Sequence, residues 1–266
     1  MTPKFEPILV PIFIGQPLLG LRHLLDLMPN YDWNIVQPQF FEADRDRSIT
    51  ETYKALSLAV RDQISAGHFP LSVAGDCVSS LGFLRGLQLA NIRPDWILWL
   101  DAHGDFHTEE TTPSGFLGGM PLAKLVGRGE QTLMRGIGTR PFPEEKILHC
   151  DGRDLDKGED TALQNSAVRQ IKRIEDLPSL GIEGDSIYVH LDTDVLDKAH
   201  VPAQNYAVAG GPSPEQLAKS IAWISDNCHV VGCSVSSWNP GMAGADQSAL
   251  DSLSVLQPFF ERASTA

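Results

Sequence analysis

Runs of apolar and β-branched residues alternate along this chain with segments whose apolar residues are spaced three and four apart. Short apolar runs between turn residues predict buried strands, whereas the three-and-four spacing predicts helices. The strands that we expect span 7–15, 33–41, 69–76, 95–105, 131–140, 183–195 and 229–240. The expected helices span 21–29, 48–67, 81–90, 213–227 and 246–263, the second beginning at a Ser48 or Thr50 cap and ending at Gly67.

This alternation of strands and helices predicts an α/β fold, with a mostly parallel sheet covered by helices on both faces. The sequence contains no internal repeat, low-complexity tract or linker-like change of composition, so one domain over residues 1–266 is the simplest interpretation. The expected loop at 104–122 is longer than most connections, and long loops in compact domains are often functional.

The amino-acid composition limits the kinds of molecule that this protein is expected to bind. The chain is 42% apolar, which suffices for a large core, and its net charge of −13 disfavours nucleic acid and anionic membranes as partners. Four cysteines without a CxxC pair are too few for a disulfide scaffold. The N-terminal apolar run is broken by prolines and has no basic n-region. We therefore expect a cytoplasmic protein that has reduced thiols and binds a small molecule.

Acidic and histidine side chains gather where two expected strands end. In WLDAHGDFH, Asp101, His103 and Asp105 are two residues apart, so an extended segment would point them the same way. In YVHLDTDVLD, Asp192 and Asp194 share a face in the same manner. Such ligands suit a pair of Mn, Mg or Fe ions better than a structural zinc, and two ions favour hydrolysis. Solvated loop acids and helix caps are the alternative.

Four segments in this chain resemble motifs of the ureohydrolase family, which includes arginase, agmatinase and formimidoylglutamase. DAHGDFHT and HLDTDVLD match its two metal motifs, SGFLGGMPL its following loop, and DGRDLDKGE its Arg-Asp-x-Asp-x-x-Glu segment. The resemblance implies an arginase-type three-layer α/β/α fold with about eight strands. It also implies two divalent ions, with Mn²⁺ favoured, at the carboxyl edge of the sheet. The reaction implied is cleavage of a guanidine or amidine C–N bond by a hydroxide bridging the ions, in a protein that can form homo-oligomers.

The resemblance assigns roles to individual residues. Asp101 and Asp192 would bridge the ions, and Asp105 would relay a proton. The implied metal ligands are Cys77, Asp101, His103, Asp105, Asp192 and Asp194. On the substrate side, Asp156 would bind an amino group, whereas His107 and Ser114 stand where the family holds a carboxylate. The full set of implied catalytic or substrate-binding positions beyond the metal ligands is His107, Ser114, Asp156, Glu159 and Ser237. Asp156 and Glu159 could equally be ordinary surface acids.

Five positions depart from the arginase pattern. Cys77 replaces the histidine of a Gly-Asp-His-Ser motif, and Gly118 stands where arginases have a histidine that shuttles protons. Ser237 replaces the glutamate that binds the guanidinium, and His107 and Phe116 each replace an asparagine. Cys77 and the LGGM segment are more similar to the hydroxyarginine amidinohydrolase subgroup. That subgroup keeps the glutamate, so Ser237 does not fit it.

Cys77 has three interpretations at this point. As a thiolate ligand it would be softer than imidazole, suiting Zn²⁺ or Fe²⁺ better than Mn²⁺. As a small buried residue it would bind nothing. As a nucleophile it would need a histidine base, such as His103 or His107, within reach.

The loss of a carboxylate at Ser237 bears on the substrate. Hydrogen bonds to a charged group contribute about 1.5–3 kcal/mol, so the change predicts weak binding of arginine or agmatine. A less basic N-hydroxyguanidine, amidine or ureido compound fits better, unless Glu109, Glu110 or Asp246 supplies the charge. The departures also leave open a catalytically silent binding or regulatory protein with the same fold.

Overall fold

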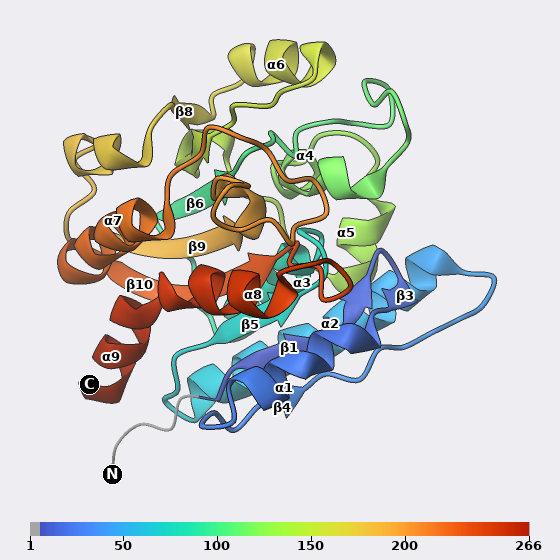
Figure 1. Ribbon diagram of the computed structural model, residues 1–266. Helices are drawn as coiled ribbons and strands as arrows, with labels where there is room; N and C mark the ends of the chain where they lie inside the picture. The colour runs from blue at the N-terminus through green and yellow to red at the C-terminus, as the bar shows by residue number, and fades with distance from the viewer. Residues whose placement is uncertain (1–5, 266) are drawn as a thin grey trace.

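An eight-stranded parallel sheet forms the centre of the molecule in the computed structural model, which describes residues 6–265 (Figure 1). The first five residues of the N-terminal run discussed above lie outside them. The strand order is β4–β1–β5–β10–β9–β6–β7–β8, and every neighbouring pair is parallel. The strands are β1 (Ile8–Val10), β4 (Asn34–Ile35), β5 (Leu71–Ala74), β6 (Trp96–Asp101), β7 (Ile147–Asp151), β8 (Arg169–Ile171), β9 (Ser186–Asp192) and β10 (His229–Ser236). A separate antiparallel hairpin joins β2 (Ile12–Phe13) to β3 (Gln16–Pro17).

Helices cover both faces of this sheet (Figure 1). The helices are α1 (Leu24–Leu27), α2 (Arg45–Ser65), α3 (Ser79–Leu89), α4 (Pro121–Leu125), α5 (Thr132–Ile137), α6 (Lys157–Gln164), α7 (Pro214–Asn227), α8 (Ala245–Ser254) and α9 (Gln257–Thr265). Short 3₁₀ turns lie at η1 (Leu19–His23), η2 (Leu117–Gly119), η3 (Glu144–Lys146), η4 (Ile174–Ser179) and η5 (Thr193–Val195). The expected three-layer α/β/α arrangement with about eight strands is confirmed.

Alternation along the strands divides the core in two. In β6, Ile97 and Trp99 pack into the core beneath α2 and α3, whereas Leu98 and Leu100 pack into the core beneath α7, α8 and α9. Successive side chains of a strand point to opposite faces, so a strand covered on both sides must be apolar throughout. This explains why β6 reads as a continuous apolar run.

Two sequence expectations are corrected. The strand expected at 131–140 is wrong: the segment forms α5, which buries Leu133, Met134 and Ile137 at helical spacing and ends before Gly138 at φ 88°. The cap expected at Ser48 or Thr50 is also wrong. Helix α2 begins at Arg45, because the Asp44 carboxylate accepts the Arg47 N–H at 2.9 Å.

Other boundaries shift. The strand expected at 33–41 shortens to the two residues of edge strand β4, ahead of Pro38, which has no N–H to donate. The helix expected at 246–263 divides into α8 and α9, with Pro258 in the first turn of the second helix. Strands β7 and β8 and helix α6 had no expected counterpart.

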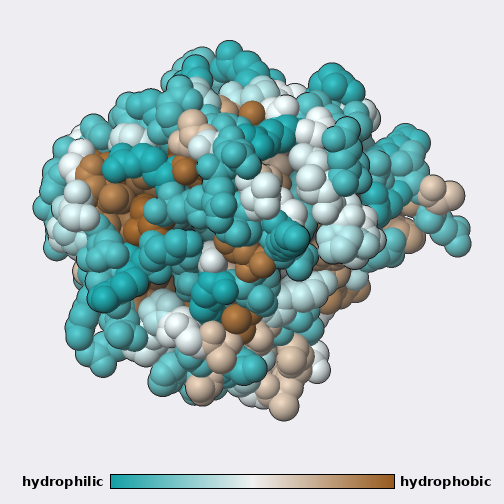
Figure 2. Space-filling model, turned by 90° about the horizontal axis from the view of Figure 1, so that it is seen from above, coloured by the Kyte–Doolittle hydropathy of each residue, from teal (hydrophilic) through white to brown (hydrophobic). Residues whose placement is uncertain are grey.

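The parallel arrangement brings several strand ends to one edge. The carboxyl ends of β5, β6, β9 and β10 lie side by side in the middle of the sheet, which is where ligands bind in open α/β folds. Viewed from above, the surface is largely hydrophilic with separate hydrophobic patches (Figure 2). Within the described residues, no helix has the length and apolar character needed to cross a membrane.

Candidate metal centre

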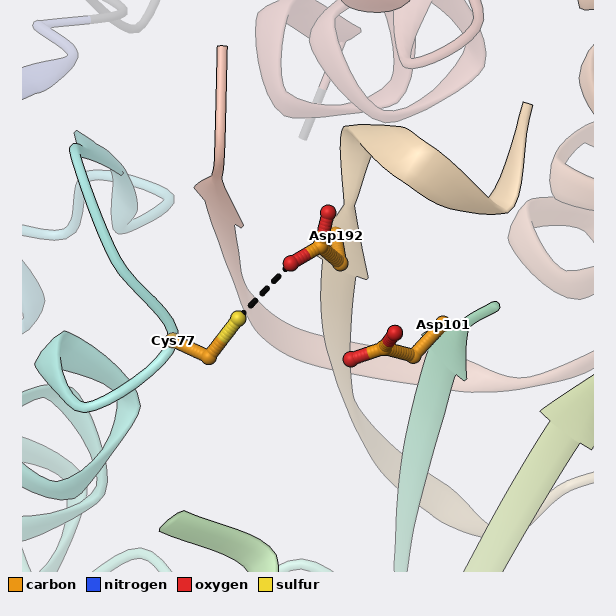
Figure 3. Close-up of side chains that lie close together, drawn as sticks. All are labelled: Cys77, Asp101 and Asp192. Carbon is orange, nitrogen blue, oxygen red and sulfur yellow. Dashed lines mark hydrogen bonds between the residues drawn. The ribbon is translucent and has the colours of Figure 1, made fainter. Parts of the chain in front are cut away.

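Five side chains at neighbouring strand ends form two clusters of possible ligand atoms, and a sixth lines the pocket beside them. Ligand atoms of Cys77, Asp101 and Asp192 lie within 4.8 Å of one another, and the same holds for Asp101, His103 and Asp194. Asp101 belongs to both groups, so the two clusters are adjacent. Figure 3 shows Cys77, from the loop after β5, pointing toward Asp192 at the end of β9, with Asp101 of β6 beside them. The sixth member, Asp105, lies in the loop after β6 and lines the same pocket.

The turn that carries Cys77 is built by its two preceding residues. A Cβ atom on Gly75 would lie 2.4 Å from the Ile12 carbonyl oxygen, so only glycine fits there. Asp76 is buried, and its carboxylate accepts the Ile14 N–H at 2.7 Å and the Tyr53 hydroxyl at 2.7 Å. These contacts hold the turn against the β2–β3 hairpin and α2.

The Cys77 thiol is buried among carboxylates and hydroxyls. Its thiol donates to the Asp192 carboxylate at 2.8 Å and lies 3.1 Å from the Ser236 hydroxyl. Burial, followed by the charges of Asp192, Asp105 and Asp101, raises the pKa of the thiol well above its usual range. Within the described residues, its hydrogen-bond partners include no histidine. The geometry therefore gives no support to a Cys–His nucleophile.

The second cluster centres on His103. Its Nδ1 atom lies 3.1 Å from Asp194 Oδ2 and 3.5 Å from Asp101 Oδ1. Burial lowers the pKa of His103, but hydrogen bonds to Asp101 and Asp194 outweigh this and raise it to about 12. Burial and the charge of Asp101 raise the pKa of Asp194 to about 6. His103, Asp101 and Asp194 therefore form one tightly linked group of possible ligands.

Asp105 is the clearest sign that the cluster suits divalent ions. It is 4% exposed and adopts a left-handed backbone with φ 51°. Its Oδ2 atom is buried and has no hydrogen-bond partner in the described part of the chain. Burial, together with Asp101, Asp192 and Glu159, raises the pKa of this carboxyl. An unpaired buried carboxylate is costly, and a cation placed beside it removes that cost.

The pocket above these residues is acidic. It has a volume of about 290 Å³. The acids that line it are Asp76, Asp105, Asp154, Asp156, Glu159, Asp192 and Asp194, and none of its described lining residues is Lys or Arg. Two divalent ions would offset this charge, so the donor set fits a two-metal centre.

Four of the other predicted site residues lie on the wall of this pocket. His107, Ser114, Asp156 and Glu159 line the pocket. Glu159 is 3% exposed, so the surface-acid alternative is wrong for it, and its carboxylate accepts the Phe106 N–H at 2.9 Å. Asp156 has an exposed side chain and lies 3.2 Å from His107 Nε2.

Ser237 lies beneath the pocket rather than on its wall. Its hydroxyl donates to the Asp192 carboxylate, and its backbone has φ 72°. The acids considered as replacements for the lost glutamate lie elsewhere: Glu109 pairs with Lys124, Asp246 pairs with His23, and Glu110 is not among the lining residues. The pocket therefore has no acid at the Ser237 position.

Arg153 supports the centre from outside the pocket. Its guanidinium donates to the carbonyl oxygens of Asp194, Val195, Val208 and Ala209 at 2.8–3.1 Å, and to the Asp151 carboxylate. It thus ties the η5 turn that carries Asp194 to the loop after it. We call this set of five contacts the Arg153 clamp.

Sequence reasoning missed several lining residues. Asp76 and Asp154 are each within two residues of a predicted site residue, and that proximity was an available signal. Phe13 and Tyr206 come from distant segments, and only the folded chain brings them to the pocket.

Comparison with known proteins identifies the family of most of the chain. The model of the family described as "Arginase family" matches residues 21–259. This chain belongs to the arginase family. A relative from Streptomyces lavendulae, "N(omega)-hydroxy-L-arginine amidinohydrolase", is 32% identical over 190 residues, covering 70% of this chain and 63% of that protein. The arginase of Brevibacillus brevis is 29% identical over 204 residues, covering 70% and 68%.

Solved arginase structures share the fold. Arginase from Bacillus subtilis has a TM-score of 0.80 with this chain at 22% identity, covering 96% of this chain and 97% of that one. Arginase from Bacillus caldovelox has a TM-score of 0.79, also at 22% identity, covering 98% of each chain. These structures confirm the arginase-type fold, and the family match over residues 21–259 confirms the resemblance recognised in the sequence.

Proposed function

We propose that this chain is a two-metal amidinohydrolase that cleaves a C–N bond of a small guanidine, N-hydroxyguanidine, amidine or ureido compound. The observation that carries the proposal is the convergence of Cys77, Asp101, His103, Asp192 and Asp194 at the floor of an acidic pocket. Membership of the arginase family supports it.

The two ions would share the central carboxylates. Cys77 and Asp105 would hold one ion, His103 and Asp194 the other, and Asp101 and Asp192 would lie between them. We propose Mn²⁺, with Fe²⁺ or Zn²⁺ as alternatives because a thiolate is a softer ligand than imidazole. When bound, two such ions lower the pKa of a water between them and polarise the substrate.

Side chains of the protein would accept the proton of the attacking water and orient the substrate. Asp105 lines the pocket, and its Oδ2 atom has no hydrogen-bond partner among the described residues, so this carboxylate is suited to accept the proton of the attacking water. Asp156, on the exposed side, would bind an amino group of the substrate, and His107 orients that carboxylate at 3.2 Å. The buried floor, where Asp101 and Asp192 are 1% and 3% exposed, keeps bulk water from the reacting atoms.

Ser237 points to a weakly basic reacting group. Its hydroxyl is engaged with Asp192, and no carboxylate stands in its place to clamp a guanidinium. An N-hydroxyguanidine is less basic than a guanidine and a ureido group is uncharged, so both depend less on such a clamp. Independently of Ser237, the relative from Streptomyces lavendulae is named for an N-hydroxyguanidine, N(omega)-hydroxy-L-arginine.

Metal analysis followed by assay tests the proposal. The protein is loaded with Mn²⁺, Fe²⁺ or Zn²⁺, its metal content is measured by mass spectrometry, and release of urea, hydroxyurea or ammonia is followed on a panel of guanidines, N-hydroxyguanidines and amidines. We expect up to two ions per chain and turnover of at least one compound. The Asp192→Asn variant serves as the inactive control. A protein without activity after loading with each metal would support the silent binding protein instead.

A further inference from the structure

Three aromatic rings form a continuous wall on one side of the pocket. The centroids of Phe13 and Phe116 are 6.4 Å apart, and those of Phe116 and Tyr206 are 5.5 Å apart. Tyr206 also meets the His103 ring edge-on at 6.3 Å, so the wall reaches the metal cluster. The three rings come from the β2–β3 hairpin, the loop before η2 and the loop after η5. We call them the aromatic shelf.

The shelf is held in place by its surroundings. A Cβ atom on Gly118 would lie 2.2 Å from the Phe116 ring, so this ring fills the space that a side chain at 118 would need. The Phe13 hairpin turns through Ile14, whose φ of 45° is unfavourable for a β-branched residue. That strained turn is retained through the Ile14 N–H bond to buried Asp76. Tyr206 is 48% exposed, which leaves it open to a ligand.

The charges around the shelf suit a cation and not an anion. Asp154 and Asp156 both line the pocket, and each side chain is 64% exposed. No lysine or arginine is among the described lining residues. His107 has both ring nitrogens engaged, 3.2 Å from Thr111 Oγ1 and 3.2 Å from Asp156 Oδ2, so it offers no free donor to a carboxylate.

We propose that the aromatic shelf and Asp154 bind an organic ammonium group with apolar substituents, and that the substrate carries such a group at the end remote from its scissile carbon. Aromatic faces attract desolvated cations, and the carboxylates reinforce that attraction. A substrate with a free carboxylate at this end would face acids without a compensating cation. The identity of the bond cleaved rests on the proposed function, whereas the ammonium site does not.

The first experiment tests the ammonium site without any reacting group. Binding of butyltrimethylammonium to the Zn²⁺-loaded protein is measured by saturation-transfer NMR, with butylammonium as the probe that lacks apolar substituents. We expect butyltrimethylammonium to bind about fivefold or more tightly than butylammonium, and Tyr206→Ala to weaken it about fivefold or more. Tyr206→Phe keeps the ring and should bind normally. Phe40→Ala removes an exposed aromatic residue that does not line the pocket and should have no effect.

The second experiment adds the reacting group. Hydrolysis of 4-guanidinobutyl(trimethyl)ammonium is compared with that of 4-guanidinobutyrate, which has an anionic tail. We expect kcat/KM to favour the ammonium compound at least tenfold, and Tyr206→Ala to reduce that preference. Unchanged butyltrimethylammonium binding in Tyr206→Ala, or a preference for the carboxylate compound, would overturn the inference. If the simple probe binds as expected but neither guanidine is hydrolysed, the ammonium site stands and the proposed function is weakened.

Discussion

At the scale of single residues, the thiol of Cys77 determines how the first ion could be held. Its sulfur lies 2.8 Å from Asp192 Oδ2, in the group of ligand atoms that also includes Asp101. A residue that merely filled space would have no need of three polar partners, which here are Asp192, Ser236 and Ser237. The geometry favours the ligand interpretation over the other two.

Replacement of Cys77 should change the metal content. We expect Cys77→Ala to lose one ligand and to fall from two ions toward one per chain after dialysis, whereas Cys77→His should retain both. The control is Cys228→Ala, which removes a buried thiol that donates a hydrogen bond to the Ile182 carbonyl oxygen. Its metal content should equal that of the wild type. Mass spectrometry of the dialysed proteins gives the answer. Equal metal content in Cys77→Ala and wild type would contradict the ligand role.

Metal affinity should rise with pH. Burial and neighbouring carboxylates raise the pKa of Cys77, Asp105 and Asp192, so these groups tend to hold protons in the ion-free protein. Ligands bind as anions, so each ion displaces protons, and affinity should increase up to tenfold per pH unit for each proton released. Calorimetric titrations between about pH 6.5 and 8.5, in buffers of different ionisation enthalpy, count those protons. Affinity that stays constant over this range would show that the ligands are already ionised.

At the scale of elements, the centre depends on loops tied together behind the strand ends. The Arg153 clamp joins the end of β7, the η5 turn and the segment at 208–209. In sequence, the last two lie on either side of Tyr206, so the Arg153 side chain supports both the candidate ligand Asp194 and the aromatic shelf. Gly211 packs against it, since a Cβ atom there would lie 2.8 Å from the guanidinium.

Weakening the clamp should affect stability and metal binding together. Lysine has three donors and cannot reach five acceptors, so we expect Arg153→Lys to lower the free energy of unfolding by about 2 kcal/mol. It should also weaken binding of the second ion, because the Asp194 backbone is released. Urea unfolding and metal titration measure the two effects. The control is Arg173→Lys, at an exposed residue paired with Glu175, which should stay within about 0.5 kcal/mol of wild type.

The same scale shows what the sequence could predict. Strands β5, β6, β9 and β10 are predicted because each lies in a segment rich in apolar and β-branched residues, and motif residues follow the ends of β5, β6 and β9. Helix α5 was mistaken for a strand because its six residues are too few to show a period clearly. Strands β7 and β8 lie toward the sheet edge and are short or partly polar, so they lack that signal. The aromatic shelf was invisible because it depends on contacts between distant segments.

At the scale of the whole molecule, the buried acidic centre destabilises the folded state, and bound cations would offset this effect. Asp101, Asp105, Asp192 and Asp194 are all nearly inaccessible and lie together, in a chain whose net charge is already −13. Burial and mutual repulsion of these carboxylates oppose folding. Ion binding to the folded state alone should therefore stabilise the protein.

That stabilisation should be visible as a shift in Tm. An ion at one hundred times its Kd contributes about 2.7 kcal/mol, and in a domain of this size each kcal/mol raises Tm by roughly 2–4 °C. Saturation of both sites with Mn²⁺ after treatment with EDTA should thus raise Tm by roughly 10–20 °C in differential scanning calorimetry. Asp192→Asn should lose most of the shift. An equal shift in that variant would place the ions elsewhere.

The central claim is that this pocket holds two ions, one of them on a thiolate. Anomalous diffraction from crystals of the Mn²⁺-loaded protein tests it most directly, because it locates each ion independently of any assay. We predict two peaks, one in contact with the sulfur of Cys77 and the other with the imidazole of His103. A single peak, or a pair that leaves Cys77 without a contact, would contradict the account.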